Sequence, residues 1–273
     1  MISKPLVKYV LTAAIRDKLM VTLLLMIAVG ASLAVFLGAA TITEQGAFSM
    51  VFGSGGLRFL GVLGIVLFCS FYIRRSFDHK EVEFLLARPL SRMTFLFSHA
   101  LAFMFLSLLV TAAVVLAVYA GGKPDMGGLF AWSVSIGVEY AIMAVAALFF
   151  SMVLSSAAGS ALATLGLYVL ARLIGTLLGI AHAPPDNIIF AVLNSVMEII
   201  SVVVPRLDLM GQTSWLVYGV EGSAGIGIRE QAGTYAYDMI ALLGMNGFSL
   251  VQGACFISLL LAASAFDFVR RQF

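Results

Sequence analysis

Residues 19–40 read L-M-V-T-L-L-L-M-I-A-V-G-A-S-L-A-V-F-L-G-A-A, a run without a single charged side chain. A helix of about 20 consecutive apolar residues is long enough to cross the hydrocarbon core of a bilayer. Similar runs follow along the chain at residues 57–73, 95–120, 130–154, 157–180 and 240–266. These runs are continuous, whereas a membrane β-barrel would show alternating strands of about ten residues. We therefore predict six transmembrane helices.

The composition of the chain points to the same class of protein. Apolar residues make up 62% of the sequence and charged residues 11%, and the mean hydropathy is +1.07. A soluble domain has roughly 45–50% apolar and 25% charged residues, so this chain belongs in a membrane. We predict an all-α polytopic membrane protein with one transmembrane domain over residues 1–273, surrounded by membrane lipid and with no nucleic-acid partner.

The basic residues predict the orientation. If the N-terminus is cytoplasmic and the chain crosses six times, the inner side holds Lys4, Lys8, Arg16, Lys18, Arg74, Arg75, Lys80, Arg88, Arg92, Arg270 and Arg271. The outer side then holds only Arg58, Lys123, Arg206 and Arg229. This distribution follows the positive-inside rule. We predict a multi-pass protein of the inner (plasma) membrane with both termini in the cytoplasm.

A shorter apolar segment at residues 188–204 is ambiguous and would add a seventh span if it crossed. Its polar residues are spaced so that they form one stripe on a helix: Asn187, Asn194, Glu198 and Ser201. The stripe favours an external or re-entrant helix within a long external connection, residues 181–239. Arg270 and Arg271, directly after the last apolar run, also favour a cytoplasmic C-terminus.

Residues 2–18 have the pattern of an amphipathic helix. Apolar side chains from Leu6 to Ile15 recur on one face, while Lys4, Lys8 and Arg16 recur at helical spacing on the other. A helix of this kind lies in the plane of the membrane interface, with its cations at the headgroups. Because the apolar run that follows is long enough to span the membrane, residues 2–18 are also unlike a cleaved signal peptide.

The stretch R-R-S-F-D-H-K-E-V-E-F-L-L-A-R-P-L-S-R-M-T-F-L-F-S-H, residues 74–99, connects the second and third predicted spans. Asp78 and Glu81 ahead of an apolar run indicate the start of a short helix, which Pro89 ends. Ser91 is then a good N-cap for the third span. Phe84 lies among charges on this short helix. It is suited either to insert into a pocket on a partner or to pack against the span ends and headgroups.

The segment E-V-E-F-L-L-A-R-P-L-S-R, residues 81–92, resembles the cytoplasmic loop between the second and third spans of ABC type-2 transporter permeases. Weaker points of similarity are S-S-A-A-G at 155–159, P-R-L-D at 205–208 and the ending F-D-F-V-R-R-Q-F. In that family the loop contains a coupling helix that docks on the ATPase. The resemblance places the coupling loop at residues 78–92, with docking residues Glu81, Glu83, Phe84, Leu85, Leu86, Arg88, Pro89, Ser91 and Arg92.

The same resemblance implies the partners. They are an ABC ATPase subunit, which binds ATP and Mg, and a second permease subunit, either another copy or a related chain. It implies that the chain couples ATP hydrolysis to substrate movement, as an exporter. The chain departs from those exporters that carry a large external domain after the first span, because residues 41–56 form only a brief connection.

The sequence indicates no catalytic or metal site of its own. It contains no G-x-x-x-x-G-K-[ST] motif, and G-S-G-G at 53–56 is better explained as a flexible turn. Its histidines lack ligand-like spacing, and Cys69 and Cys255 are expected to be buried thiols. We therefore expect no enzyme activity and no bound cofactor or metal. An ATPase-driven scaffold or sensor is the main alternative, and an intramembrane enzyme is the weakest.

Two charged residues fall inside predicted spans. Glu139 lies in the fourth run and Arg172 in the fifth, and a short turn makes these two helices antiparallel neighbours. A charge at the bilayer centre costs at least about 2.5–3.5 kcal/mol on insertion scales, so each needs a partner. We predict a Glu139–Arg172 ion pair, which is either a structural clamp or part of a substrate path or gate.

Overall fold

The structure, a computed structural model, describes residues 2–41, 45–79, 91–181, 196, 199–200, 204–223 and 235–270. Over these residues the regular secondary structure is all helix, with no strand. The helices are α1 Lys4–Arg16, α2 Lys18–Ala39, α3 Gln45–Asp78, α5 Arg92–Gly121, α6 Met126–Val153, α7 Ala157–Ala181, α9 Trp215–Ser223 and α10 Tyr235–Arg270.

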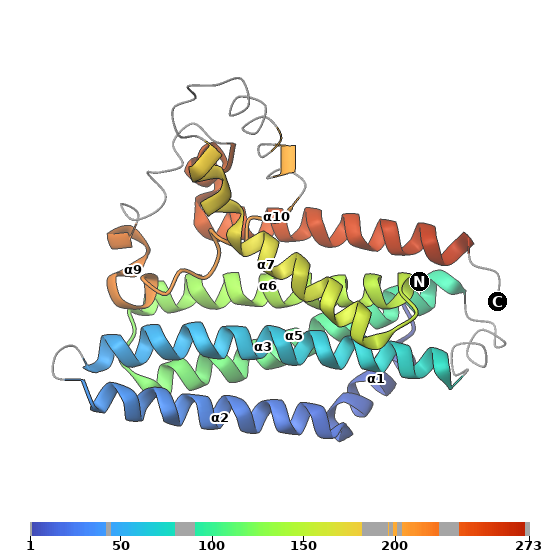
Figure 1. Ribbon diagram of the computed structural model, residues 1–273, viewed down its shortest axis with the longest axis horizontal. Helices are drawn as coiled ribbons and strands as arrows, with labels where there is room; N and C mark the ends of the chain where they lie inside the picture. The colour runs from blue at the N-terminus through green and yellow to red at the C-terminus, as the bar shows by residue number, and fades with distance from the viewer. Residues whose placement is uncertain are drawn as a thin grey trace.

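Six of these helices are long and apolar enough to span a membrane: α2, α3, α5, α6, α7 and α10. The prediction of a polytopic helical membrane protein is therefore confirmed. Helices α2, α3, α5, α6 and α10 run along the long axis of the molecule, while α7 crosses this direction obliquely (Figure 1). Helix α6 is central, because it packs against α3, α5, α7, α9 and α10.

One end of the bundle collects both ends of the chain, and we call it the termini end. There Arg75, near the end of α3, forms an ion pair with Asp17 at 3.1 Å. Arg92, at the start of α5, donates a hydrogen bond to the carbonyl of Phe268, near the end of α10, at 3.2 Å. Figure 1 shows the N- and C-terminal labels at this same end. The opposite end, which holds the α5–α6 connection, is called the far end.

The described helices are arranged as an even number of spans requires. A seventh crossing at residues 188–204 would put the C-terminal end of α10 at the far end. Helix α10 instead finishes beside the start of α5. The connection between α7 and α10 therefore begins and finishes on the same side, as an even number of spans requires. The helix predicted at 188–204 itself lies almost entirely outside the described residues.

Helix α3 is longer than predicted. The second span was expected at 57–73, with a glycine-rich turn before it, but α3 begins at Gln45 and includes G-S-G-G at 53–56. A Cβ on Gly53 would lie 3.0 Å from the Cβ of Ala34, so α2 and α3 approach closely here. The weak helix propensity of glycine is overridden because a membrane demands internal hydrogen bonds along the whole backbone. The loop before α3 is correspondingly shorter than the predicted 41–56.

Helix α1 has the amphipathic character that the sequence predicted. Leu6, Val10 and Ala14 are buried against the bundle. The backbone N–H of Ser3 donates to Oγ of Ser98 in α5 at 2.9 Å. Asp17 ends α1 and also caps α2, because its side chain accepts a hydrogen bond from the N–H of Leu19. Helix α1 is therefore fixed to α5 at its first turn and joined to α2 by a sharp bend.

Candidate functional site

The interior of the bundle holds a stretch of non-helical chain, residues 204–214, which we call the inserted segment. It is made of turns and bends, yet Arg206, Leu207 and Met210 are completely buried. The chain then returns to the far end, where the N–H of Asp125 donates to the carbonyl of Leu216 at 2.9 Å. Irregular backbone at membrane depth is tolerated only where protein or water surrounds it. Its carbonyl groups therefore need donors from neighbouring helices.

Two arginines supply those donors. Arg58, from α3, donates to the carbonyls of Gly211 at 2.8 Å and Met210 at 3.1 Å. Arg172, from α7, donates to Leu207 and also to Met210, the latter at 3.1 Å. The two guanidinium groups therefore share the carbonyl of Met210. Their hydrogen bonds satisfy backbone carbonyl groups of the inserted segment, which is not helical.

Glu139, from α6, balances the charge of Arg58. Nε of Arg58 donates to Oε1 of Glu139 at 2.8 Å, and Nη2 donates to Oε2, so the pair is bidentate. The side chains are 3% and 0% exposed, respectively. Both residues lie about 20 Å along their helices from the far end, at 1.5 Å per residue. A bidentate Arg–carboxylate pair is the geometry in which two charges can share a buried site.

The partner of Glu139 differs from the prediction. We expected Arg172, but the structure pairs Glu139 with Arg58, and Arg172 binds backbone carbonyls beside them. The sequence-based spans placed Arg58 at the outer surface, because the second span was taken to begin at residue 57. The apolar stretch A-F-S-M-V-F, residues 47–52, was the signal that α3 extends further and carries Arg58 into the bundle.

The contact between α3 and α6 is close around the ion pair. The hydroxyl of Tyr140, next to Glu139 in sequence, donates to the backbone carbonyl of Arg58 at 3.0 Å. A Cβ on Gly61 would overlap this hydroxyl group, so only glycine fits at that position. Helices α3 and α6 are therefore joined twice within one helical turn. One contact is the Arg58–Glu139 ion pair, and the other is the hydrogen bond from the Tyr140 side chain to the backbone of Arg58.

The other part of the inserted segment is tied to α7 and α10. Arg206 forms a bidentate contact with Asp208, with donor–acceptor distances of 2.9 and 2.8 Å. Asp208 lies against Gly175 of α7, where a Cβ would collide with its carboxylate. The N–H of Arg206 donates to Oε1 of Gln252 in α10 at 3.2 Å. The inserted segment therefore contacts α3, α7 and α10, and also α6, where Ile136 lies against Gly211.

The predicted coupling loop is only partly covered by the structure. The candidate docking residues Glu81, Glu83, Phe84, Leu85, Leu86, Arg88 and Pro89 lie outside the described residues. Ser91 caps α5 as predicted, with its Oγ accepting a hydrogen bond from the N–H of Thr94 at 3.1 Å. Asp78 was expected to start a new helix but is the last residue of α3, where it pairs with Arg74 at 3.2 Å.

The sequence also made predictions about metal sites and about the two cysteines. Among the residues that the structure describes, there is no group of three or more His, Cys, Asp and Glu side chains that could hold a metal. Cys69 is buried as expected, but Cys255 is exposed on α10, contrary to the prediction.

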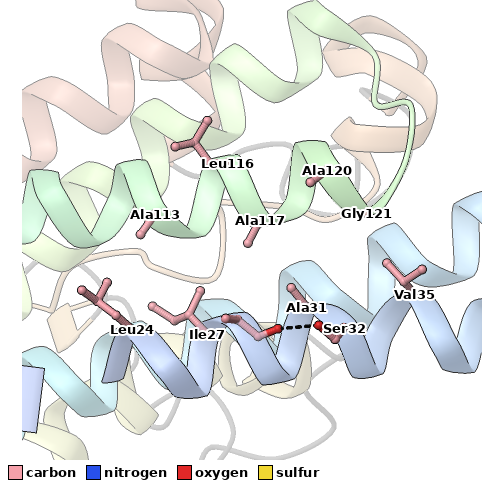
Figure 2. Close-up of a pocket in the computed structure, with 11 residues that line it drawn as sticks. Leu24, Ile27, Ala31, Ser32, Val35, Ala113, Leu116, Ala117, Ala120 and Gly121 are labelled. Carbon is pink, nitrogen blue, oxygen red and sulfur yellow. Dashed lines mark hydrogen bonds between the residues drawn. The ribbon is translucent and has the colours of Figure 1, made fainter. Parts of the chain in front are cut away.

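Figure 2 shows a groove of about 640 Å³ between α2 and α5. Its lining is apolar and includes Leu24, Ile27, Ala31, Ala113, Leu116 and Ala117. The hydroxyl of Ser32 donates to the carbonyl of Ala28 in its own helix at 2.9 Å. Because Leu24 and Leu116 are also strongly exposed, this groove belongs to the lipid-facing surface and is separate from the buried ion pair.

No protein-family model matches the chain, and no curated protein is similar enough to match it.

Proposed function

We propose that this chain is the membrane-spanning permease subunit of an ATP-driven ABC transporter of the type-2 class, acting as an exporter. ATP and Mg are bound by a separate ABC ATPase subunit, and a second permease, identical or related, completes the membrane part. The observation that carries the proposal is the position of the coupling-loop pattern, residues 81–92. Helices α3 and α5, which flank it, end and begin at the termini end of the bundle.

The distribution of charge supports a cytoplasmic location for this end. The described basic residues at the termini end are Lys4, Lys8, Arg16, Lys18, Arg74, Arg75, Arg92 and Arg270. At the far end, the described part of the chain has Lys123 in the α5–α6 connection. By the positive-inside rule, the termini end faces the cytoplasm of a cell with this chain in its inner (plasma) membrane. An ATPase subunit is found on that side.

The helices that flank the loop lead directly to the buried ion pair. Helix α3 is continuous from Asp78 at the termini end to Gln45 at the far end, and it carries Arg58. Helix α5 begins at Arg92, immediately after the loop. A push on the loop tilts α3 against α6 and so moves Arg58 relative to Glu139. Because packed interfaces switch between discrete arrangements, this tilt releases the carbonyls of the inserted segment and changes the exposure of a central path.

The test is whether the loop binds an ATPase. The full chain, tagged and purified from its native membrane, is expected to co-purify with a protein that contains a Walker A motif and hydrolyses ATP. Phe84→Asp and Arg88→Glu are each expected to reduce this recovery by about tenfold or more, because a hot-spot contact contributes about 1.4 kcal/mol or more. Lys123→Glu, at the far end, is the control and is expected to leave recovery unchanged.

Two outcomes of this co-purification would contradict the proposal. Membrane insertion and the yield of folded chain must be the same for all variants. If Phe84→Asp and Arg88→Glu then recover the ATPase as well as the unmodified chain does, the loop is not the docking surface. If the native complex contains no ATPase, the transporter proposal itself is wrong.

A further inference from the structure

A groove of about 340 Å³ lies between α1 and α5 at the termini end. Helix α1 is held there by the Ser3–Ser98 hydrogen bond and by the burial of Leu6 and Val10. The groove is formed by the side of α1 next to this buried face and by two residues of α5, Leu101 and Phe105. Both walls are therefore rigid helices that already pack against each other.

The chemistry of the lining divides the groove into two parts. Val7, Leu11 and Ile15 of α1 face Leu101 and Phe105 across an apolar space. Lys4 and Lys8, one helical turn apart on α1, also line the groove. None of the described residues that line the groove is acidic. The ammonium groups make no ion pair with any part of the chain that the structure describes, and both lysines are exposed.

We propose that this groove binds one anionic phospholipid of the leaflet at the termini end, with its headgroup phosphate at Lys4 and Lys8 and an acyl chain between α1 and α5. An exposed apolar slot beside two cations matches an amphiphile with a negative head. The amphipathic character of α1 places it at the depth where headgroups meet acyl chains. Each basic residue near an anionic surface contributes about 1 kcal/mol, and long lysine stems reach the headgroup while covering apolar surface.

The position of this lipid gives it a functional consequence. Leu101 and Phe105 lie on α5 within four turns of Arg92, where α5 emerges from the predicted coupling loop. A lipid held between α1 and α5 therefore stabilises the packing of α5 at the end where it receives force. Its binding does not depend on the transporter proposal, because it uses only α1, α5 and the bilayer.

Lipid binding can be measured by native mass spectrometry of the full chain, delipidated in detergent and titrated with phosphatidylglycerol or phosphatidylcholine. We expect one phosphatidylglycerol to bind more tightly than phosphatidylcholine. Lys4→Gln with Lys8→Gln is expected to weaken phosphatidylglycerol binding about 25-fold, at about fivefold for each charge, and to abolish the preference. Arg16→Gln is the matched control, because Arg16 is a basic residue of α1 outside the groove.

A second pair of variants tests the apolar part. Leu101→Trp fills the groove and is expected to weaken the binding of both lipids. Leu109→Trp adds the same bulk to α5 at a position that is 58% exposed and does not line the groove, so binding should be unchanged. The proposal is overturned if the two lipids bind equally to the unmodified chain, if Arg16→Gln weakens binding as much as Lys4→Gln with Lys8→Gln does, or if Leu101→Trp has no effect.

Discussion

Arg58 makes two kinds of contact inside the bundle. It shares a bidentate pair with Glu139 and also donates to the carbonyls of Met210 and Gly211. The carboxylate removes the cost of a lone charge, and the carbonyls use the remaining donors. Removing one partner of a buried ion pair is strongly destabilising, by about 3–5 kcal/mol, because the other charge is left uncompensated.

This assignment predicts a particular pattern of coupling. Glu139→Gln and Arg58→Gln, combined in a double-mutant cycle, are expected to show an interaction energy within the roughly 0.5–3 kcal/mol typical of contacting pairs. The same cycle with Arg172→Gln in place of Arg58→Gln should give a smaller value, because Arg172 binds carbonyls instead of Glu139. Unfolding of the purified chain in detergent micelles provides the free energies. A larger coupling for Arg172 than for Arg58 would restore the original pairing.

At the level of the helices, the contact between α6 and α9 fixes the position at which the chain leaves the inserted segment. The carbonyl of Trp215 lies so close to Gly128 that a Cβ there would overlap backbone atoms. A backbone group cannot rotate away as the end of a flexible side chain can. The position of Trp215, and with it the end of the inserted segment, therefore depends on the absence of a side chain on α6.

Gly128→Ala is expected to destabilise the chain by about 1–3 kcal/mol, as overpacking of a tight contact does. Gly166→Ala is the control, since Gly166 is exposed on α7 and has no atom within 4 Å of a built Cβ. That control should be neutral or stabilising, by up to about 1 kcal/mol, because alanine is the better helix former. The midpoint of thermal unfolding in micelles compares the two. Equal midpoints would mean that α9 does not pack on α6 in this way.

For the molecule as a whole, the membrane orientation is the property on which the proposed coupling depends. Both termini lie at one end of the bundle, and that end is rich in described basic residues. The far end carries the α5–α6 connection with Lys123. An ATPase in the cytoplasm reaches the predicted coupling loop only if the termini end faces inward.

A chain in which Cys69 and Cys255 are replaced by alanine provides the background for testing orientation. Lys123→Cys in that background is expected to react with a membrane-impermeant maleimide added outside intact cells or spheroplasts. Arg16→Cys and Arg270→Cys are expected to react only after the membrane is opened. Labelling of Arg16→Cys from outside would place the termini end, and the coupling loop with it, on the wrong side for an ATPase.

The sequence alone determined the class of fold, six of the membrane-spanning helices and the N-cap of α5. Each of these depends on local properties: the length of an apolar run, or a serine placed just before one. Hydropathy also showed that Glu139 and Arg172 lie within spans and therefore need partners.

Only the tertiary structure decided which partners those are. Hydropathy marks the least polar part of a helix, so the predicted second span began at Leu57 and left Arg58 at the outer surface, although Arg58 is the partner of Glu139. The inserted segment was likewise invisible, because residues 204–214 are held in the bundle by hydrogen bonds with side chains of α3, α7 and α10, which are distant in the sequence. Hydrogen bonds between remote groups leave no periodic pattern in a single chain, and so packing alone brings Arg58, Glu139 and the carbonyl of Met210 together.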